Sequence, residues 1–167
     1  PNYIEQGNSS LVYMVDKLIQ QSGFAESGFY LNTLNKLIET LKTLEEKGQP
    51  ALLIGVSFAL LDIAELNELT LRNTIVMEPG GMKGRRKEMV RSELHDELKI
   101  GFGVAEIHSE YGMTELLSQA YSKGKGLFNC PPWMKVMIRD ANDPFQSLPS
   151  EKAGGINVID LANIYSC

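Results

Sequence analysis

The residues with the clearest chemical potential form the stretch Tyr111-Gly112-Met113-Thr114-Glu115. A threonine hydroxyl can donate a hydrogen bond to a phosphate oxygen, and a glutamate carboxylate can hold a magnesium ion that keeps several of its waters. A β-prone run, 104–108, precedes the stretch and a helix-prone run, 116–120, follows it. A glycine allows a tight turn there, and the N–H groups that begin a helix attract anions. The stretch suits a phosphate site, but local chemistry alone favours the alternative, in which Thr114 caps the helix and Glu115 lies in its first turn, where a negative charge is favourable.

Two histidines and a glycine pair are further candidates. Gly80-Gly81 could present backbone to a ligand, although glycines often simply build a turn. His108 ends the run 104–108, where it could lie beside a carboxylate substrate or serve as a structural hydrogen-bonding residue. His95 lies among acidic residues on a predicted helix, so we expect it at the surface.

Basic and thiol groups give weaker signals. A basic cluster could attract ATP or an acidic carrier partner, but a solvated face is the favoured interpretation because charge runs usually form one. Cys130 and Cys167 are not closely spaced, so we expect neither a disulfide framework nor a cysteine metal site. We expect Cys130, before Pro131-Pro132, to be a buried small apolar residue. The basic cluster consists of Lys83, Arg85, Arg86, Lys87 and Arg91.

Length and composition indicate one folded domain with a sizeable core. The chain has 167 residues, of which 43% are hydrophobic and 22% charged. A net charge of −5 argues against nucleic acid as a partner. The sequence contains neither an apolar run of membrane-spanning length nor a recognisable signal at its start, so we expect no membrane association and a cytoplasmic location.

Hydrophobic periodicity predicts helices that alternate with strands. This alternation indicates βαβ units and an α/β fold with a parallel sheet and flanking helices. We expect the first helix to face the core with Asn8 or Ser9 as its N-cap, the first strand to be buried on both faces, and Ser92 to cap the fourth helix. The predicted helices cover 11–19, 31–44, 58–69 and 92–98, and the predicted strands cover 51–56, 72–77 and 104–108.

The predicted turns converge at one edge of the sheet. Ligands of parallel sheets bind beyond the carboxyl ends of the strands, where the turns 55–57, 80–83 and 111–115 would meet. From residue 123 onward, glycines and prolines first interrupt the chain. Two strands, 133–138 and 156–161, then lie on either side of a polar turn, 140–144, and predict an antiparallel pair. We therefore expect an α/β portion over 1–122 and the start of a small β subdomain over 123–167.

The motif segment SEYGMTELLSQAY resembles the Tyr-Gly-x-Thr-Glu signature of the adenylate-forming enzymes. With EPGGMKGRRKEM before it, PPWMKVMIRDANDP and GGINVIDLANIYSC after it, and YIEQGNSSLVYMVDKLI near the start, the chain is similar to acyl-protein synthetases. These are the LuxE-type enzymes, or long-chain-fatty-acid–luciferin-component ligases. The similar blocks occur in order through nearly the whole chain.

This resemblance implies a reaction in which a carboxylate attacks the α-phosphate of ATP, giving acyl-AMP and pyrophosphate, before the acyl group moves to a thiol. Thr114 would bind the α-phosphate and Glu115 would ligate magnesium. Nucleotide-binding residues would be Gly80, Gly81, Tyr111, Gly112 and Met113. Met82 stands where many relatives carry glutamate. The implied partners are ATP, magnesium, a fatty or other carboxylic acid, and an acyl-transfer protein.

Several parts of the family's machinery do not occur in this sequence. They are the phosphate loop, the aspartate that binds ribose, and the domain with the catalytic lysine; neither cysteine matches the family's acylated position. We therefore expect an internal piece of a longer ligase that does not adenylate efficiently by itself. The alternatives are a non-catalytic nucleotide- or acyl-binding module and a phenylacetate-CoA-ligase-like enzyme for an aryl acid. The sequence does not select the acid, the thiol acceptor or the oligomeric state.

Overall fold

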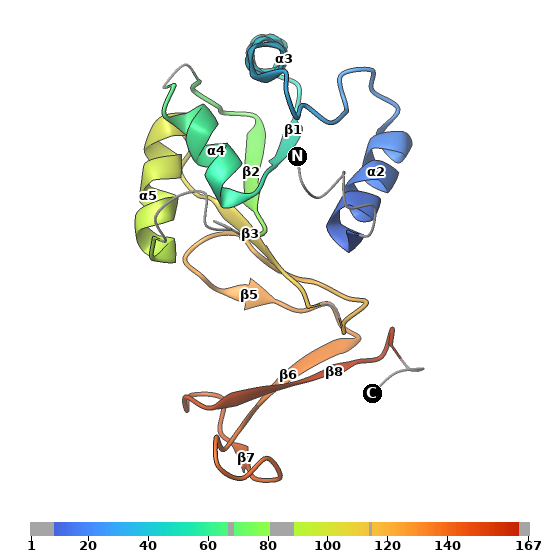
Figure 1. The fold of residues 1–167 in the computed structure, drawn as a ribbon, viewed down its shortest axis with the longest axis vertical. Helices are drawn as coiled ribbons and strands as arrows, with labels where there is room; N and C mark the ends of the chain where they lie inside the picture. The colour runs from blue at the N-terminus through green and yellow to red at the C-terminus, as the bar shows by residue number, and fades with distance from the viewer. Residues whose placement is uncertain (1–8, 67–68, 81–88, 114, 164–167) are drawn as a thin grey trace. The chain divides into compact units, whose positions relative to one another are not determined.

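The structure is a computed structural model that describes residues 9–66, 69–80, 89–113 and 115–163 (Figure 1). It separates into two compact units, Pro1–Ile107 and His108–Cys167. Compact units need not coincide with domains, so the domain boundary expected after residue 122 stays a prediction. Among the described helices, none is both long and apolar enough to cross a membrane.

The first unit alternates helices with two parallel strands, and this confirms the predicted α/β class (Figure 1). Strand β1, Ala51–Ile54, pairs in parallel with β2, Thr74–Glu78, in a register that places Leu53 opposite Val76. Helix α4 lies between the two strands in the chain, as a βαβ unit requires. The helices of this unit are α2 (Ser10–Ser22), α3 (Leu34–Glu46), α4 (Ser57–Ala64) and α5 (Arg91–Phe102).

The core of the first unit is formed by leucine-rich faces of three helices and the inner face of the strands. Leu98 and Phe102 of α5 are completely buried, and Val76 of β2 is nearly so. Helix α3 confirms the amphipathic periodicity predicted for 31–44, except that Leu31 and Leu34 remain exposed. Its buried residues are Leu37, Ile38, Leu41 and Leu44.

Helix α2 forms as expected but does not face a core. Ser9 is its N-cap, with the Oγ atom accepting a hydrogen bond from the Val12 N–H at 3.4 Å, which confirms that prediction. The core-facing prediction is wrong for the described structure, because α2 has no buried residue and Leu18, which belongs to the predicted face, is 46% exposed. Its apolar stripe is therefore only partly covered.

Three other predictions are corrected, which concern the burial of β1, the end of α4 and the start of α5. Strand β1 is not buried on both faces, because Leu52 is half exposed beside the buried Leu53. Helix α4 ends at Ala64 instead of continuing to residue 69. Helix α5 begins at Arg91, so Ser92 lies inside it and the N-cap position falls on Val90, which makes no side-chain cap.

The second unit contains only β-strands and loops among its described residues. Strand β3, His108–Tyr111, pairs antiparallel with β4, Ala120–Ser122, which pairs antiparallel with β5, Phe128–Asn129. The strand predicted over 104–108 is thus displaced toward the C-terminus, and the helix predicted over 116–120 is replaced by a loop that leads into β4. Competing hydrogen bonds to the backbone of this loop explain the missing helix, as described below.

The predicted antiparallel pair near the C-terminus is confirmed. Strand β6, Met134–Arg139, pairs with β8, Gly155–Asp160, from Met134↔Asp160 to Arg139↔Gly155. A short strand, β7 (Ser147–Leu148), adds to the other edge of β6. These three strands form a separate antiparallel sheet.

Helices α4 and α5 pack closely at Gly101, and this contact gives a stability prediction. A Cβ atom at Gly101 would lie 2.7 Å from the backbone oxygen of Ala64, which cannot move without shifting α4. We expect Gly101→Ala to lower the free energy of unfolding by about 2 kcal/mol, measured by urea denaturation, because overpacking outweighs the gain in helix propensity. Gly28→Ala, which meets nothing within 4 Å, is the matched control. Equal stability of the two variants would contradict this packing account.

Glu45 at the end of α3 gives a pH-dependent prediction. Its carboxylate accepts hydrogen bonds from the N–H groups of Arg72 (2.8 Å) and Asn73 (3.1 Å) and from Thr74 Oγ1 (2.7 Å). Burial raises the pKa of Glu45, but these hydrogen bonds outweigh it and leave the pKa below its ordinary value.

Because the folded-state pKa of Glu45 is lowered, its stabilisation is fully present above the ordinary glutamate pKa and is lost as the pH falls through the folded value. We expect the stability difference between the parent protein and Glu45→Gln to be largest near neutral pH. It should shrink in acid, below the ordinary value of 4.5, in urea denaturation at a series of pH values. A difference that grows in acid would show the opposite sign of the shift.

Candidate functional site

The predicted signature lies at the end of β3 and in the loop that follows. Tyr111 is the last residue of β3, opposite Ala120 of β4. We call residues 112–119 the motif loop. Within it, Met113 and Glu115 are exposed, whereas Thr114 lies outside the described residues, so its predicted role stays a prediction. The loop leads into β4.

Aromatic packing fixes one side of the loop's start. The half-buried ring of Tyr111 meets the ring of Phe128 edge-on, with centroids 6.0 Å apart. A Cβ atom at Gly112 would approach the Oε1 atom of Glu110 at 2.9 Å and the Cγ atom of Gln119 at 3.4 Å, and both atoms belong to flexible side chains. The structure therefore gives no steric requirement for glycine at this position.

The other side of the motif loop is bound by the carboxylate of Asp160 at the end of β8. Asp160 Oδ2 accepts hydrogen bonds from the N–H groups of Leu117 (3.0 Å) and Ser118 (2.8 Å). Asp160 Oδ1 accepts from the Ser118 hydroxyl (2.7 Å) and from the Ala162 N–H (3.0 Å). Ser118 Oγ also accepts from Trp133 Nε1 at 2.9 Å. The loop is thereby tied to the β6–β8 hairpin.

These contacts remove the anion site that the sequence predicted from a helix N-terminus. The N–H groups of Leu117 and Ser118, which would begin that helix, already donate to Asp160. A side-chain acceptor that satisfies backbone N–H groups competes with helix formation. A phosphate near this loop would instead depend on the side chains of the signature.

Hydrogen bonding also sets the charge of Asp160. Burial raises the pKa of its carboxyl, but the Ser118 hydroxyl and the backbone N–H groups of Ala162, Ser118 and Leu117 outweigh this and hold the pKa below its ordinary value. Hydrogen bonds favour the charged form that accepts them. Asp160 is therefore ionised at neutral pH.

Glu115 meets the basic requirement for a magnesium ligand. Its carboxylate is exposed, while its backbone oxygen accepts a hydrogen bond from Asn163 Nδ2. Magnesium typically takes only one or two protein carboxylates and completes its shell with water and phosphate oxygens, so a single exposed carboxylate suits it. Among the described residues, no group of three or more His, Cys, Asp or Glu side chains forms a metal cluster.

The first unit contains a second polar cluster, around the buried carboxylate of Glu78. Glu78 Oε2 accepts hydrogen bonds from the Gly80 N–H (2.7 Å) and the Ser57 hydroxyl (3.3 Å). Glu78 Oε1 lies 3.1 Å from His95 Nε2 and 3.7 Å from Arg91 Nε. Glu78 is 1% exposed, so these partners compensate the cost of burying its charge.

This cluster joins two of the turns that the sequence placed at the carboxyl ends of the strands. Ser57 follows β1, and Gly80 follows β2 with a left-handed φ of 86° that favours glycine. Their shared contact with Glu78 shows that these two turns meet. Gly81 lies outside the described residues, and the third turn belongs to the other unit.

The sequence analysis predicted His95 at the surface and did not identify Glu78 as a candidate. The prediction that His95 is a surface residue is wrong, because it is 8% exposed and contacts Glu78. Its spacing to Leu98 and Phe102 is that of one helical face, and this signal was available. Likewise, Thr74, Val76 and Glu78 alternate as the buried face of β2.

The remaining candidates are His108, the two cysteines and the basic cluster. His108 begins β3 instead of ending a strand and is half-buried, so its place near an acyl carboxylate stays a prediction. Cys130 is exposed, which corrects the expectation of a buried thiol. Of the basic cluster, Arg91 contacts Glu78, whereas residues 83–87 lie outside the described residues, as does Cys167.

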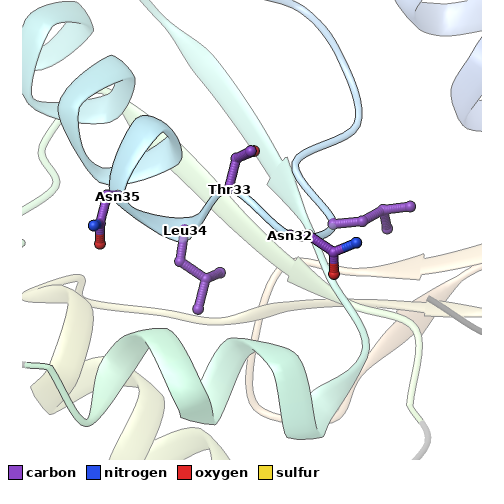
Figure 2. Close-up of a pocket in the computed structure, with 5 residues that line it drawn as sticks. Asn32, Thr33, Leu34 and Asn35 are labelled. Atoms are coloured by element: carbon purple, nitrogen blue, oxygen red, sulfur yellow. The ribbon is translucent and has the colours of Figure 1, made fainter.

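Two surface hollows lie apart from these clusters in the first unit. The larger, of about 440 Å³, is lined by the five consecutive residues 31–35 before and at the start of α3. Thr33 and Leu34 point in opposite directions there (Figure 2). The smaller hollow, of about 160 Å³, lies between α4 and α5 near Ile100. Neither is lined by a predicted site residue, and we assign no ligand to them.

The buried Glu78 cluster gives a stability prediction. We expect Glu78→Gln to lower the free energy of unfolding by about 1–3 kcal/mol in urea denaturation, because an amide has one acceptor oxygen and places an NH₂ group against donors. Glu39→Gln, at an exposed position of α3, is the matched control and should change stability by less than about 0.5 kcal/mol. Indistinguishable variants would refute the role of this carboxylate.

Comparisons with known proteins give a fold likeness. No protein-family model matches the sequence, and no curated protein matches it either. Among solved structures, the chain is similar to the crystal structure of apo MatB from Rhodopseudomonas palustris, with a TM-score of 0.56 and 17% identity. The likeness covers 76% of this chain and 24% of the MatB chain. The chain thus shares its fold with a segment that spans about a quarter of MatB.

Proposed function

We propose that this chain is part of an ATP-dependent ligase that activates a carboxylic acid as acyl-AMP and then transfers the acyl group to a thiol. The observation that carries this proposal is the fold likeness to MatB, which is an adenylate-forming enzyme. The Tyr-Gly-x-Thr-Glu signature at Tyr111–Glu115 supports the same class independently of the fold. Fold and motif therefore favour one chemistry.

The chemistry divides into two balanced steps. An oxygen of the substrate carboxylate attacks the α-phosphorus of ATP, and pyrophosphate leaves with the electron pair of the broken P–O bond. The thiolate then attacks the acyl carbon, and AMP leaves with the former carboxylate oxygen. The protein's contribution to such a reaction is orientation and neutralisation of negative charge.

In this proposal Thr114 binds the α-phosphate and Glu115 supplies a carboxylate ligand to magnesium, which screens the phosphate charge. The exposed carboxylate of Glu115 supports its role. Tyr111, Gly112 and Met113 line the nucleotide and acyl channel, and Gly80-Gly81 contributes the turn beside adenine.

The finer assignment follows the sequence resemblance. We propose a fatty acid as the carboxylate and an acyl-transfer protein as the thiol partner, as in LuxE-type acyl-protein synthetases. A cytoplasmic location belongs to the same proposal. An aryl-acid CoA ligase would use the same first step. Competition between a fatty acid and an aryl acid would therefore identify the preferred acid, and competition between protein thiol and CoA would identify the acceptor.

The proposal is tested in the gene product that carries this chain. We expect carboxylate-dependent exchange of labelled pyrophosphate into ATP, and Glu115→Ala should reduce the exchange at least about tenfold at limiting magnesium because a metal ligand is lost. Folding should be unaffected in circular dichroism, since the Glu115 side chain is exposed. Glu151→Ala, also exposed and in the same unit, is the control.

The outcomes separate the candidate functions. Exchange that is unchanged in Glu115→Ala removes Glu115 from the site. No exchange with any carboxylic acid, combined with AMP or acyl-chain binding in calorimetry, replaces the ligase with a non-catalytic binding module.

A further inference from the structure

The end of β8 contacts the motif loop more extensively than strand pairing requires. Strand β8 is already held by its register with β6, in which Asp160 lies opposite Met134. The Asp160 carboxylate adds hydrogen bonds from two consecutive backbone N–H groups, those of Leu117 and Ser118. Three residues outside the loop, Trp133, Asp160 and Asn163, hold it through hydrogen bonds. We call these three residues, together with the loop residue Ser118, the clamp.

The clamp fixes the loop in more than one direction. One Asp160 oxygen accepts from two neighbouring N–H groups, and the other accepts from the Ser118 hydroxyl and the Ala162 N–H. Bonds to both oxygens of one carboxylate restrict rotation as well as displacement. Ser118 is 5% exposed, so its hydroxyl is held by Asp160 and the Trp133 indole away from water.

The clamp reaches Glu115 itself. Asn163, three residues after Asp160, donates from Nδ2 to the backbone oxygen of Glu115. Two residues further along the loop, the Leu117 N–H is bound by Asp160. The backbone of Glu115 is therefore anchored at its carbonyl and just beyond, while its carboxylate stays exposed.

We propose that Asp160 and Asn163 are positioning residues that orient the Glu115 carboxylate toward its magnesium ion. This proposal rests on the proposed function. Asp160 is not itself the ligand, because both of its oxygens already accept two hydrogen bonds each. Groups that orient a metal ligand typically change metal affinity by about 10–100-fold when they are removed.

The test compares Asp160→Asn with Asp143→Asn in the gene product that carries this chain. Asp143 accepts the Phe145 N–H in an exposed turn of the same unit, so the control makes the same chemical change away from the motif loop. Trp133 reports on the clamp directly. The emission of Trp133 is obtained by subtracting the fluorescence spectrum of the corresponding Trp133→Phe variant from the spectrum of each protein.

We expect Asp160→Asn to shift the Trp133 emission and to speed amide hydrogen exchange at Leu117 and Ser118, whereas Asp143→Asn does neither. We also expect the magnesium concentration for half-maximal pyrophosphate exchange to rise about tenfold in Asp160→Asn, with a smaller change in the rate at saturating magnesium. Asn163→Ala should also raise the magnesium concentration for half-maximal exchange.

A double-mutant comparison distinguishes positioning from a general loss of structure. If Asp160 acts through Glu115, adding Asp160→Asn to Glu115→Ala should raise the half-saturating magnesium concentration less than twofold further. If the double variant instead raised the half-saturating magnesium concentration by the product of the two separate effects, the proposal would be overturned. A changed Trp133 emission with an unchanged magnesium requirement would overturn it too, while leaving the ligase assignment intact. Absence of exchange in the unmodified protein would instead refute the proposed function.

Discussion

Backbone N–H groups outside helices and sheets need acceptors, and in this chain carboxylates supply them at three irregular segments, two of which belong to the candidate site. Asp160 accepts the N–H groups of Leu117 and Ser118 in the motif loop, and Glu78 accepts that of Gly80 in the turn after β2. Glu45 does the same for Arg72 and Asn73 just before β2. Asp160 and Glu45 come from distant parts of the chain, whereas Glu78 lies two residues before Gly80 and also accepts from the distant Ser57 hydroxyl, so the conformation of these segments depends on tertiary contacts.

This constraint changes how the signature would operate. A helix after Tyr111–Glu115 would have offered its N-terminal N–H groups to phosphate, but the loop observed there gives two of those groups to Asp160. In the proposed site, phosphate binding would then depend on side chains, with the exposed Glu115 carboxylate acting through a magnesium ion. The motif supports the proposed carboxylate-activating ligase, and the fold is similar to that of a segment that makes up 24% of the MatB chain.

Periodicity predicted the structure well where packing is local. The leucine spacing of α3 identified its buried face, and the apolar runs before and after the turn at 140–144 identified β6 and β8. Failures occurred where a distant partner decides the outcome: Asp160 lies more than forty residues from the loop whose helix it prevents. His95 was misassigned because its acidic neighbours in sequence suggested solvent, whereas its helical face is apolar and its partner, Glu78, belongs to β2. Of the candidate site, Gly80 follows β2 and Glu115 is exposed, but their roles stay predictions, and Thr114 and Gly81 lie outside the described residues.

The central claim, activation of a carboxylate through acyl-AMP, is most directly tested by following oxygen. The gene product that carries this chain would be given ATP and a carboxylic acid labelled with ¹⁸O in its carboxyl group, with a thiol acceptor, and the nucleotide products would be analysed by mass spectrometry. The account predicts AMP that carries one ¹⁸O atom from the acid, because the carboxylate oxygen leaves with AMP after acyl transfer. ADP together with labelled inorganic phosphate would show activation at the γ-phosphate and would contradict it.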